Sequence, residues 1–405
     1  MIHSFSAANF FSFKDTAEVP FQVGAGAPDT EQFFISGTGQ RLSKVQVVIG
    51  PNGSGKTNLL KALPFLRYFM LSSFSRIDPE DRILVSAFSF SRETMPMCLC
   101  IEFEEGGGLY KYELVLGQDS DSDLGVNREQ LSKKYEKSYR YLFKREYDGG
   151  SYKIALQDLS VSLKDVHALG QRRNASLFSV LRHIGTPEIT AISNGLQKMY
   201  TNVDYIGKVD SGHFGNLGTV AKLYAQRPEL KDFVESILSD LDLGLSGFEI
   251  EEYPAPDDDE QKGSRFFPVG IHTINGESYP LRFAFESTGT KKLFVLLAKI
   301  VPVLFEGGVA VIDEFETDLH PHMIPRLLDL FFDPVTNPHN AQLLFSCHAT
   351  EILQRLDKTQ INLVEKDSET CESEAYRLDQ LKGVRRDDNF YAKYMSSVYG
   401  AVPNI

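Results

Sequence analysis

The chain of 405 residues has few cysteines, no long apolar segment and no excess of positive charge. Its four cysteines, Cys98, Cys100, Cys347 and Cys371, are scattered, which indicates reduced thiols in a cytoplasm rather than a disulfide framework. No apolar run approaches the roughly 20 residues that span a bilayer, and the first residues lack a secretory signal pattern. We therefore expect a cytoplasmic protein without a membrane segment. The net charge of −13 argues against a protein that coats nucleic acid with its whole surface, but leaves room for one basic groove.

The most informative stretch that is present is 45–57, which reads VQVVIGPNGSGKT. Its first five residues are rich in β-branched side chains, as in a short buried strand, and 50–57 fits G-x-x-x-x-G-K-[ST]. A helical pattern begins at Asn58, and we expect it to continue to about Leu71 with a kink at Pro64. Strand, glycine-rich loop and helix in this order predict a phosphate-binding loop (P-loop) rather than an ordinary glycine-rich turn.

Each residue type in this loop has a chemical reason. Glycines let the backbone curl so that successive N–H groups point at phosphate oxygens, and the helix N-terminus adds partial positive charge. We expect Lys56 to reach the β- and γ-phosphates of ATP, and the Thr57 hydroxyl to ligate Mg²⁺. The predicted nucleotide-binding residues of this loop are Asn52, Gly53, Ser54, Gly55, Lys56, Thr57 and Asn58.

Two acidic residues at the end of another apolar run would complete this chemistry. Asp313 and Glu314 follow the buried strand pattern at 309–312, as in a Walker B motif. We expect Asp313 to hold Mg²⁺ through water and Glu314 to orient the attacking water, since phosphoryl transfer depends chiefly on such positioning. A helix N-terminal acid pair is the alternative for these residues. A third apolar run is followed by His348, which we interpret as a switch histidine near the γ-phosphate.

A weaker signal precedes the apolar helical run at 293–301. The stretch E-S-T-G-T at 286–290 places Ser287 and Gly289 at the start of that helix. Serine is a good N-cap residue, and N–H groups face outward at a helix start. S-x-G before a helix is common, but its position before the two carboxylates predicts that Ser287 and Gly289 contact a nucleotide.

The chain divides into two strand-rich ends and a helical middle. Alternating patterns predict hairpins within 1–24 and 98–116, and Asn275-Gly276 predicts another tight turn. Apolar residues at helical spacing fill the middle, and an acidic loop covers 254–263. We predict an α/β fold with a mixed central sheet, an antiparallel β subdomain and a helical insertion. The predicted domains are 1–159, 160–245 and 246–405.

One segment combines basic and aromatic side chains on this acidic chain. Within 127–147, tyrosines are interleaved with Lys133, Lys134, Lys137, Arg140, Lys144 and Arg145. Such interleaving suits a nucleic-acid backbone, whereas the solvated face of a twisted hairpin is the interpretation we favour. Arg172 and Arg173 form a second basic candidate. DNA therefore stays open as a partner.

The order of these motifs resembles the ABC-type ATPase head, which has a P-loop, a long insertion, a signature, a Walker B pair and a histidine. Here 313 − 56 = 257 residues separate the P-loop lysine from the Walker B aspartate, many more than is normal in AAA+ proteins. Four stretches resemble the RloA/AbiLii-like bacterial ATPases: N-F-F-S-F-K-D at 9–15, G-P-N-G-S-G-K-T-N-L-L at 50–60, E-S-T-G-T at 286–290 and Y-G-A-V-P-N-I at 399–405. The resemblance spans nearly the whole chain and implies ATP and Mg²⁺ as cofactors.

This resemblance implies an ATP-hydrolysing switch of bacterial anti-phage defence that controls a separately encoded effector nuclease. It also implies a dimer, because in such heads the signature of one copy faces the P-loop of a second copy. The tail leaves no room for a Toprim domain, so we expect the nuclease on another chain. An SMC-type DNA-repair ATPase is one alternative, but 160–245 is too short and too broken by glycine for coiled-coil arms. A transporter ATPase subunit is the other.

Two features depart from the resemblance. No glutamine takes a convincing Q-loop position between the P-loop and residue 117, so that role stays unassigned. The signature reads E-S-T-G-T rather than L-S-G-G-Q, although Ser287 and Gly289 keep the hydroxyl and the close backbone approach.

Overall fold

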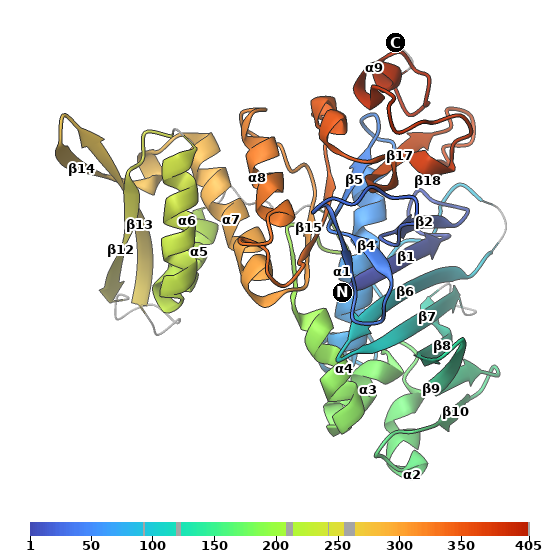
Figure 1. The fold of residues 1–405 in the computed structure, drawn as a ribbon. Helices are drawn as coiled ribbons and strands as arrows, with labels where there is room; N and C mark the ends of the chain where they lie inside the picture. Colours follow the sequence, from blue (N-terminus) through green and yellow to red (C-terminus); the bar gives the residue numbers. More distant parts are fainter. Residues whose placement is uncertain (92–93, 119–122, 208–213, 242, 255–263, 404–405) are drawn as a thin grey trace.

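A central six-stranded sheet carries the P-loop near its middle (Figure 1). The computed structural model describes residues 1–91, 94–118, 123–207, 214–241, 243–254 and 264–403. The strand order is β11-β15-β16-β5-β17-β18, and all neighbours are parallel except β17 and β18. The strands are β5 (Val45–Ile49), β11 (Met199–Thr201), β15 (Val309–Ile312), β16 (Gln342–Ser346), β17 (Ile361–Lys366) and β18 (Ser373–Arg377).

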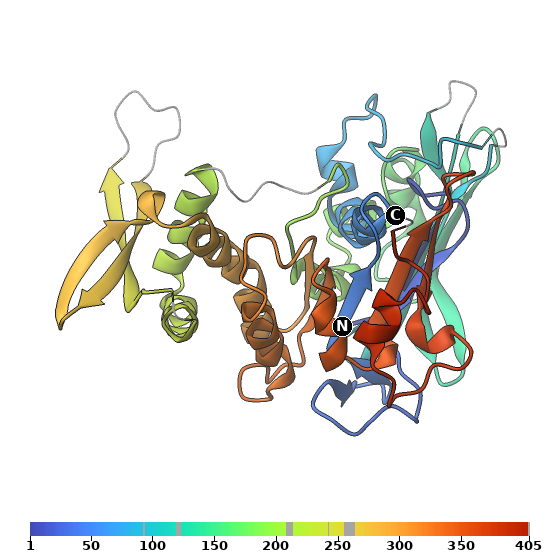
Figure 2. The same ribbon diagram turned by 90° about the horizontal axis from the view of Figure 1, so that it is seen from above.

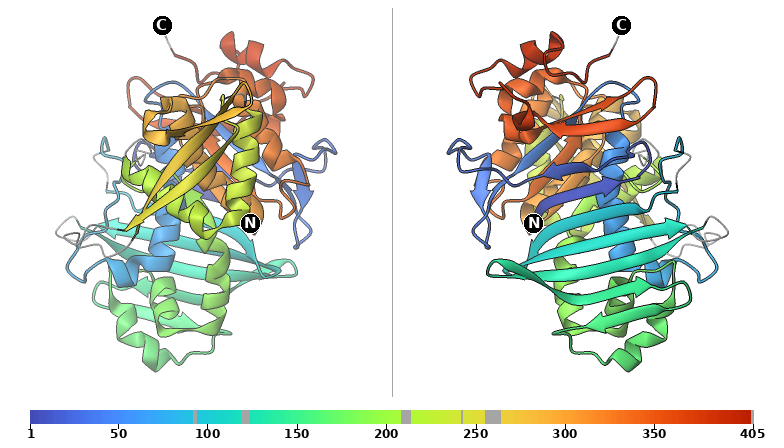
Figure 3. Two further views of the ribbon diagram at one scale, coloured as in Figure 1. Left: turned by 90° about the vertical axis from the view of Figure 1, so that its left-hand side faces the viewer. Right: turned by 90° about the vertical axis from the view of Figure 1, so that its right-hand side faces the viewer.

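A seven-stranded antiparallel sheet forms the β subdomain (Figure 3, right). Its strand order is β10-β9-β8-β7-β6-β1-β2. Alternating burial along β6 and β7 shows that one face packs on the core and the other meets solvent. The strands are β1 (Ile2–Ala8), β2 (Ala17–Pro20), β6 (Met97–Glu105), β7 (Gly108–Gln118), β8 (Leu124–Tyr135), β9 (Ser138–Tyr147) and β10 (Tyr152–Leu156).

The P-loop helix α1 (Lys56–Arg76) contacts both sheets. Its buried side chains share one core cluster with the inner face of the β subdomain and with Val48 of the central strand. The neighbouring residues Val47 and Ile49 belong to a second cluster on the opposite face, under α7 (Thr288–Glu306) and α8 (Met323–Phe332). The central strand is therefore buried on both faces, which explains its unbroken apolar sequence.

A smaller three-stranded sheet projects from the α7 side of the molecule (Figures 1 and 2). It is formed by β12 (Gly247–Pro254), β13 (Ser264–Ile274) and β14 (Glu277–Arg282), and it packs on α5 (Phe214–Gln226) and α6 (Pro228–Asp240). The remaining elements are β3 (Phe33–Ile35), β4 (Arg41–Ser43), α2 (Leu163–His167), α3 (Leu177–Ile184), α4 (Pro187–Gln197) and α9 (Phe390–Met395).

The predicted fold class is confirmed, and so are the three predicted hairpins. The Asn275-Gly276 turn has left-handed φ values of 53° and 86°, as a tight hairpin turn requires. Strand β14 ends at Arg282, where Phe283–Phe285 forms a 3₁₀ turn. Helix α8 begins two residues after Pro321. The predicted acidic loop lies, apart from Pro254, outside the described residues.

Helix α1 continues through Pro64 to Arg76, beyond the predicted end at Leu71. Arginines of the following helical region explain the extra length. Arg182 donates to the Leu71 carbonyl oxygen at 2.9 Å, and Arg172 donates to that of Phe74 at 2.9 Å. The bond to Phe74 satisfies one of the last four carbonyl groups of α1, which a helix end otherwise leaves without partners.

The helices of the predicted insertion divide between the two core clusters. Residues of α3 and α4 pack into the cluster around α1, whereas residues of α5 and α6 pack into the cluster around α7. The boundaries at 159/160 and 245/246 stay predictions. Among the described residues, no helix is long and apolar enough to cross a membrane.

Arg145, which we placed in an exposed basic patch, is fully buried. Its side chain pairs with the equally buried Glu129 of β8, with Nη2 and Oε2 2.7 Å apart. Arg145 pairs with Glu129 in the β8–β9 ladder and lies two residues from the buried Phe143, so both side chains face the core. The expectation for Arg145 was therefore wrong, because its partner Glu129 lies on another strand and the sequence does not show their pairing. Arg172 is also engaged, through its bonds to the end of α1.

Candidate functional site

Two glycines set the path of the P-loop from β5 into α1. Gly55 is the N-cap of the helix and has a φ of 112°, a conformation that other residues rarely adopt. A Cβ on Gly50 would lie 2.0 Å from the Val364 carbonyl oxygen, so only glycine fits at the start of the loop. The loop can thus turn its N–H groups toward one point.

Lys56 lies folded over this loop and is 7% exposed. Its Nζ donates to the carbonyl oxygens of Gly50 at 2.8 Å and Pro51 at 2.9 Å. Burial lowers the pKa of the Lys56 ammonium, and nearby carboxylates, Asp313 foremost, offset part of this effect. A buried cation next to a ring of N–H groups favours anionic oxygen ligands.

The two residues predicted to ligate magnesium lie in contact, although 256 positions separate them. Thr57 Oγ1 donates to Asp313 Oδ2 at 2.8 Å. Ser346, at the end of β16, donates its hydroxyl to the other oxygen, Asp313 Oδ1. A hydroxyl and a carboxylate are the hard oxygen ligands that Mg²⁺ prefers, so this pair fits the predicted ion.

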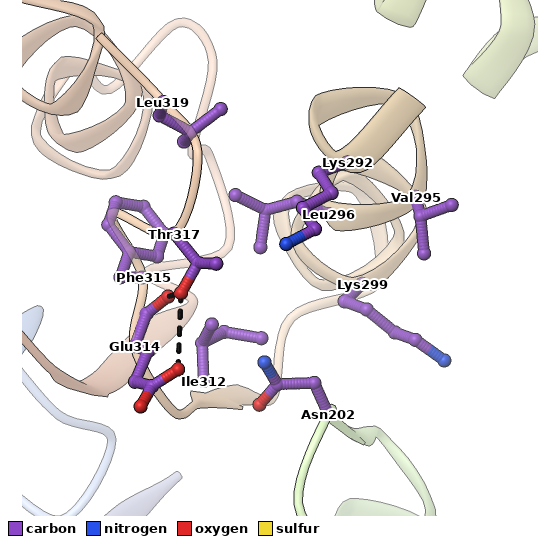
Figure 4. Close-up of a pocket in the computed structure, with 10 residues that line it drawn as sticks. All are labelled: Asn202, Lys292, Val295, Leu296, Lys299, Ile312, Glu314, Phe315, Thr317 and Leu319. Carbon is purple, nitrogen blue, oxygen red and sulfur yellow. Dashed lines mark hydrogen bonds between the residues drawn. The ribbon is translucent and has the colours of Figure 1, made fainter. Parts of the chain in front are cut away.

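Glu314 directly follows this pair and has an uncommon backbone conformation. Its φ is 50°, in the left-handed region, and its N–H donates to Ser346 Oγ at 2.7 Å. The carboxylate accepts a hydrogen bond of 3.3 Å from Thr317 Oγ1 (Figure 4). Such strained residues cluster at functional sites because the surrounding structure fixes the side chain.

Asn202 directly follows the edge strand β11, and its side-chain amide forms two hydrogen bonds with the main chain of Asp313. Asp313 N–H donates to Asn202 Oδ1 at 2.7 Å, and Asn202 Nδ2 donates to the Asp313 carbonyl oxygen at 2.9 Å. Sequence reasoning missed this residue, because its position depends on the parallel pairing of β11 with β15. Its only sequence signal was a short apolar stretch before a polar residue.

His348 follows β16 by one residue and is exposed at the same site. Its main-chain N–H donates to Glu316 Oε1 at 2.6 Å. The other oxygen, Glu316 Oε2, is buried and has no hydrogen-bond partner among the described residues. The loop that carries His348 is thus tied to the segment after Glu314.

Asp313, Glu314, His348 and residues of the P-loop line one cavity of about 210 Å³. It includes two residues that the sequence did not indicate: Ser12, whose hydroxyl accepts from Asn58 Nδ2 at 3.0 Å, and Lys366 at the end of β17. Ser54 is buried beside the cavity, and its hydroxyl has no partner among the described residues. The cavity is lined by Ser12, Asn52, Gly53, Gly55, Lys56, Thr57, Asn58, Asp313, Glu314, His348 and Lys366.

Neither Ser287 nor Gly289 lines this cavity in the described part of the chain. Ser287 is the N-cap of α7, and its hydroxyl accepts from the Thr290 N–H at 3.1 Å. A Cβ on Gly289 would lie 2.8 Å from the Asp318 carbonyl oxygen. Both residues therefore have roles within their own chain, and neither makes its predicted contact with a nucleotide at this cavity.

The P-loop, its buried lysine and the hydroxyl–carboxylate pair place this chain in the class of P-loop ATPases. Residues 45–354 match the AAA_21 family, described as "AAA domain, putative AbiEii toxin, Type IV TA system". The chain therefore belongs to the AAA_21 family. No curated protein matches it in sequence.

Two solved structures are similar at low identity. An SMC head bound to the C-winged helix domain of ScpA shares 14% identity, covers 94% of this chain and 98% of its own, and has a TM-score of 0.47. An SMC head domain with an extended coiled coil, bound to the C-terminal domain of ScpA from Pyrococcus furiosus, shares 12% identity. It covers 98% of this chain and 99% of its own, with a TM-score of 0.39.

Proposed function

We propose that this chain binds and slowly hydrolyses ATP with Mg²⁺, and that hydrolysis switches a dimer between two states. The observation that carries the proposal is the contact of Thr57 with Asp313, with Glu314 held beside it. Sequence-distant residues of the types that phosphoryl transfer needs converge on one cavity.

Each side chain then has a defined task. The loop N–H groups and Lys56 bind the phosphates, while Thr57 and Asp313 hold Mg²⁺, which neutralises phosphate charge when bound. Glu314 orients the attacking water and accepts its proton. Asn202 fixes the main chain of Asp313, and we assign it the place of the missing Q-loop residue at the sheet edge.

The metal pair offers the direct test of this proposal. Thr57→Val removes the hydroxyl while keeping the shape, and Thr57→Ser keeps the hydroxyl as a matched control. We expect a metal chelator to stop phosphate release by the wild-type chain. Phosphate release should fall about tenfold or more in Thr57→Val and stay near the wild-type rate in Thr57→Ser. Lys56→Ala should weaken nucleotide binding itself. A wild-type chain that releases no phosphate at any Mg²⁺ concentration would refute the proposed hydrolysis.

We further propose that two copies meet head to tail around two nucleotides. The position of Ser287 and Gly289 outside the P-loop cavity supports this arrangement. The Ser287 hydroxyl of one copy would meet the γ-phosphate on the other, so that hydrolysis removes the contact and loosens the dimer. The interface becomes the element that an effector can read.

A cytoplasmic role in anti-phage defence, with a separately encoded effector nuclease, is our proposal for the biological setting. It rests on the resemblance to RloA/AbiLii-like ATPases. The described helices of 160–245 are at most 13 residues long, which disfavours the alternative of an SMC-type arm. Purifying the chain together with the products of its genomic neighbours would identify the effector.

DNA is the second partner to be tested, on the β8–β9 hairpin. Lys134 lies 5.9 Å from the Tyr139 ring centroid, and Lys144 lies 5.1 Å from that of Tyr141. Basic and aromatic side chains therefore lie side by side on this hairpin, although Arg145 is buried and does not belong to the surface. Replacing Lys133, Lys134, Lys137 and Arg140 together should weaken DNA binding and its salt dependence. Unchanged affinity would remove this surface from consideration.

A further inference from the structure

A second cavity, of about 300 Å³, lies between helix α7 and the segment that follows β15 (Figure 4). Glu314 is the one residue that lines both cavities among the described residues. Helix α7 forms one wall, and the segment 312–319 forms the wall opposite. The size is at the lower end of the range for small-molecule sites. It is lined by Asn202, Lys292, Val295, Leu296, Lys299, Ile312, Glu314, Phe315, Thr317 and Leu319.

Apolar and polar side chains share the lining of this cavity equally. Leu296 of α7 faces Phe315 and Leu319 across the cavity, which gives both walls an apolar surface (Figure 4). Asn202 and the Glu314–Thr317 pair lie at one end, and Lys292 and Lys299 extend from the α7 wall (Figure 4). Apolar walls with polar groups at defined places are typical of sites for small organic ligands.

Two lysines on the α7 wall give this cavity its charge. Lys292 and Lys299 are seven positions apart, so they lie on the same side of the helix. Lys292 forms an ion pair with Asp318. Lys299 is half-buried and forms no hydrogen bond or ion pair within the described ranges. Burial lowers the pKa of the Lys299 ammonium, and no neighbouring charge opposes this effect. A desolvated ammonium without a counter-ion gains from an anionic ligand.

We propose that this second cavity binds a small amphipathic anion, with its apolar body between Leu296 and Phe315 and its anionic group at Lys299. The anionic end would lie away from both Glu314 and Phe315, because the Lys299 side chain extends away from the segment 312–319 (Figure 4). The occupant would lie against the Glu314–Thr317 hydrogen bond. Any effect of this ligand on ATP hydrolysis rests on the proposed function, whereas binding of the ligand does not depend on that function.

The fluorescent anion 8-anilinonaphthalene-1-sulfonate is a suitable probe, because it combines apolar rings with one sulfonate. We expect saturable binding of one probe to each wild-type chain. Lys299→Met keeps the length of the side chain and should weaken binding about tenfold or more. Leu296→Trp fills the cavity and should abolish binding. Lys291→Met is the matched control, since Lys291 lies on the same helix outside this lining and should leave binding unchanged.

Lys56→Ala separates the two cavities, because a probe bound at the P-loop would respond to it. We expect this variant to bind the probe with wild-type affinity. The proposal fails if the wild type shows no saturable binding, if Lys56→Ala abolishes it, or if Lys299→Met binds as tightly as the wild type. Circular dichroism checks the fold of Leu296→Trp, and Lys299→Met decides alone if that variant does not fold. The readout contains no ATP, so it holds whether or not the chain hydrolyses ATP.

Discussion

The β subdomain and the P-loop region each bury a cluster of charged side chains, and they use their hydrogen-bonding groups differently. In the β subdomain, Glu129 accepts bonds from Tyr112 and Ser176 and from main-chain N–H groups at the start of α3, besides its ion pair. Arg145 donates its remaining N–H groups to main-chain carbonyl oxygens, among them Gly170 at 3.0 Å. This cluster satisfies its own charges and joins β8 and β9 to the helices that hold the end of α1.

The P-loop cluster is incomplete by comparison. The Ser54 hydroxyl and Glu316 Oε2 are buried without partners among the described residues. Within the ranges that the structure describes, the Lys56 ammonium donates only to main-chain carbonyl oxygens of its own loop. Unsatisfied buried groups are costly and rare in folded proteins. We infer that the satisfied cluster serves stability, and that a ligand at the P-loop would supply partners that the second cluster lacks.

The largest expected effect is on hydrolysis, at the incomplete cluster. Glu314→Gln keeps the shape but removes the proton acceptor, so turnover should fall roughly 100-fold to 10,000-fold while nucleotide still binds. Phosphate release and a fluorescent-nucleotide titration measure the two properties separately. Glu351→Gln, at an exposed position after His348, is the control and should change neither. Wild-type turnover in Glu314→Gln would show that another residue positions the water.

The next largest effect is on stability, at the complete cluster. Arg145→Met leaves Glu129 as an unpaired buried charge, which should lower the free energy of unfolding by about 3–5 kcal/mol in urea titrations. Arg140→Met, on the exposed face of the same strand, should change it by roughly 0.5 kcal/mol or less. If Arg145→Met is as stable as Arg140→Met, the Glu129–Arg145 pair does not stabilise the fold and the comparison fails.

The smallest effect concerns Ser287, which we assign both a structural and a functional role. Ser287→Ala removes the N-cap of α7 and should lower stability by about 1 kcal/mol. Ser287→Asp keeps a good N-cap but adds a negative charge that repels phosphate, so stability should return while hydrolysis does not. Hydrolysis at the wild-type rate in Ser287→Asp would leave this residue with the capping role alone.

The sequence predicted those parts of the site that follow from contiguous motifs. The P-loop with its flanking strand and helix could be read directly, and so could the carboxylates that end β15. Parallel strands bring their carboxyl ends to one edge of a sheet, which is why Thr57 and Asp313 could be expected to meet. The two side chains lie 2.8 Å apart, and their shared metal role stays a prediction.

Other residues could not be predicted, because their roles depend on pairing between distant segments. Asn202 reaches Asp313 only because the three-residue strand β11 joins the edge of the central sheet. Ser12 reaches Asn58 through the turn after β1, and Lys366 joins the cavity from the end of β17. Arg145 looked exposed because the pairing that sets it against the buried Glu129 of β8 is not visible in the sequence.

The most direct test of the composite site mixes two inactive variants, Lys56→Ala and Ser287→Asp. A mixed dimer contains one intact site, made from the P-loop of the Ser287→Asp chain and the Ser287 of the Lys56→Ala chain. In an equal mixture half of the dimers are mixed, each with one of two sites intact, so about a quarter of wild-type hydrolysis should return if the sites are independent. Pull-down with two different tags confirms that mixed dimers form. A mixture that forms mixed dimers but stays as inactive as its components would contradict the composite site.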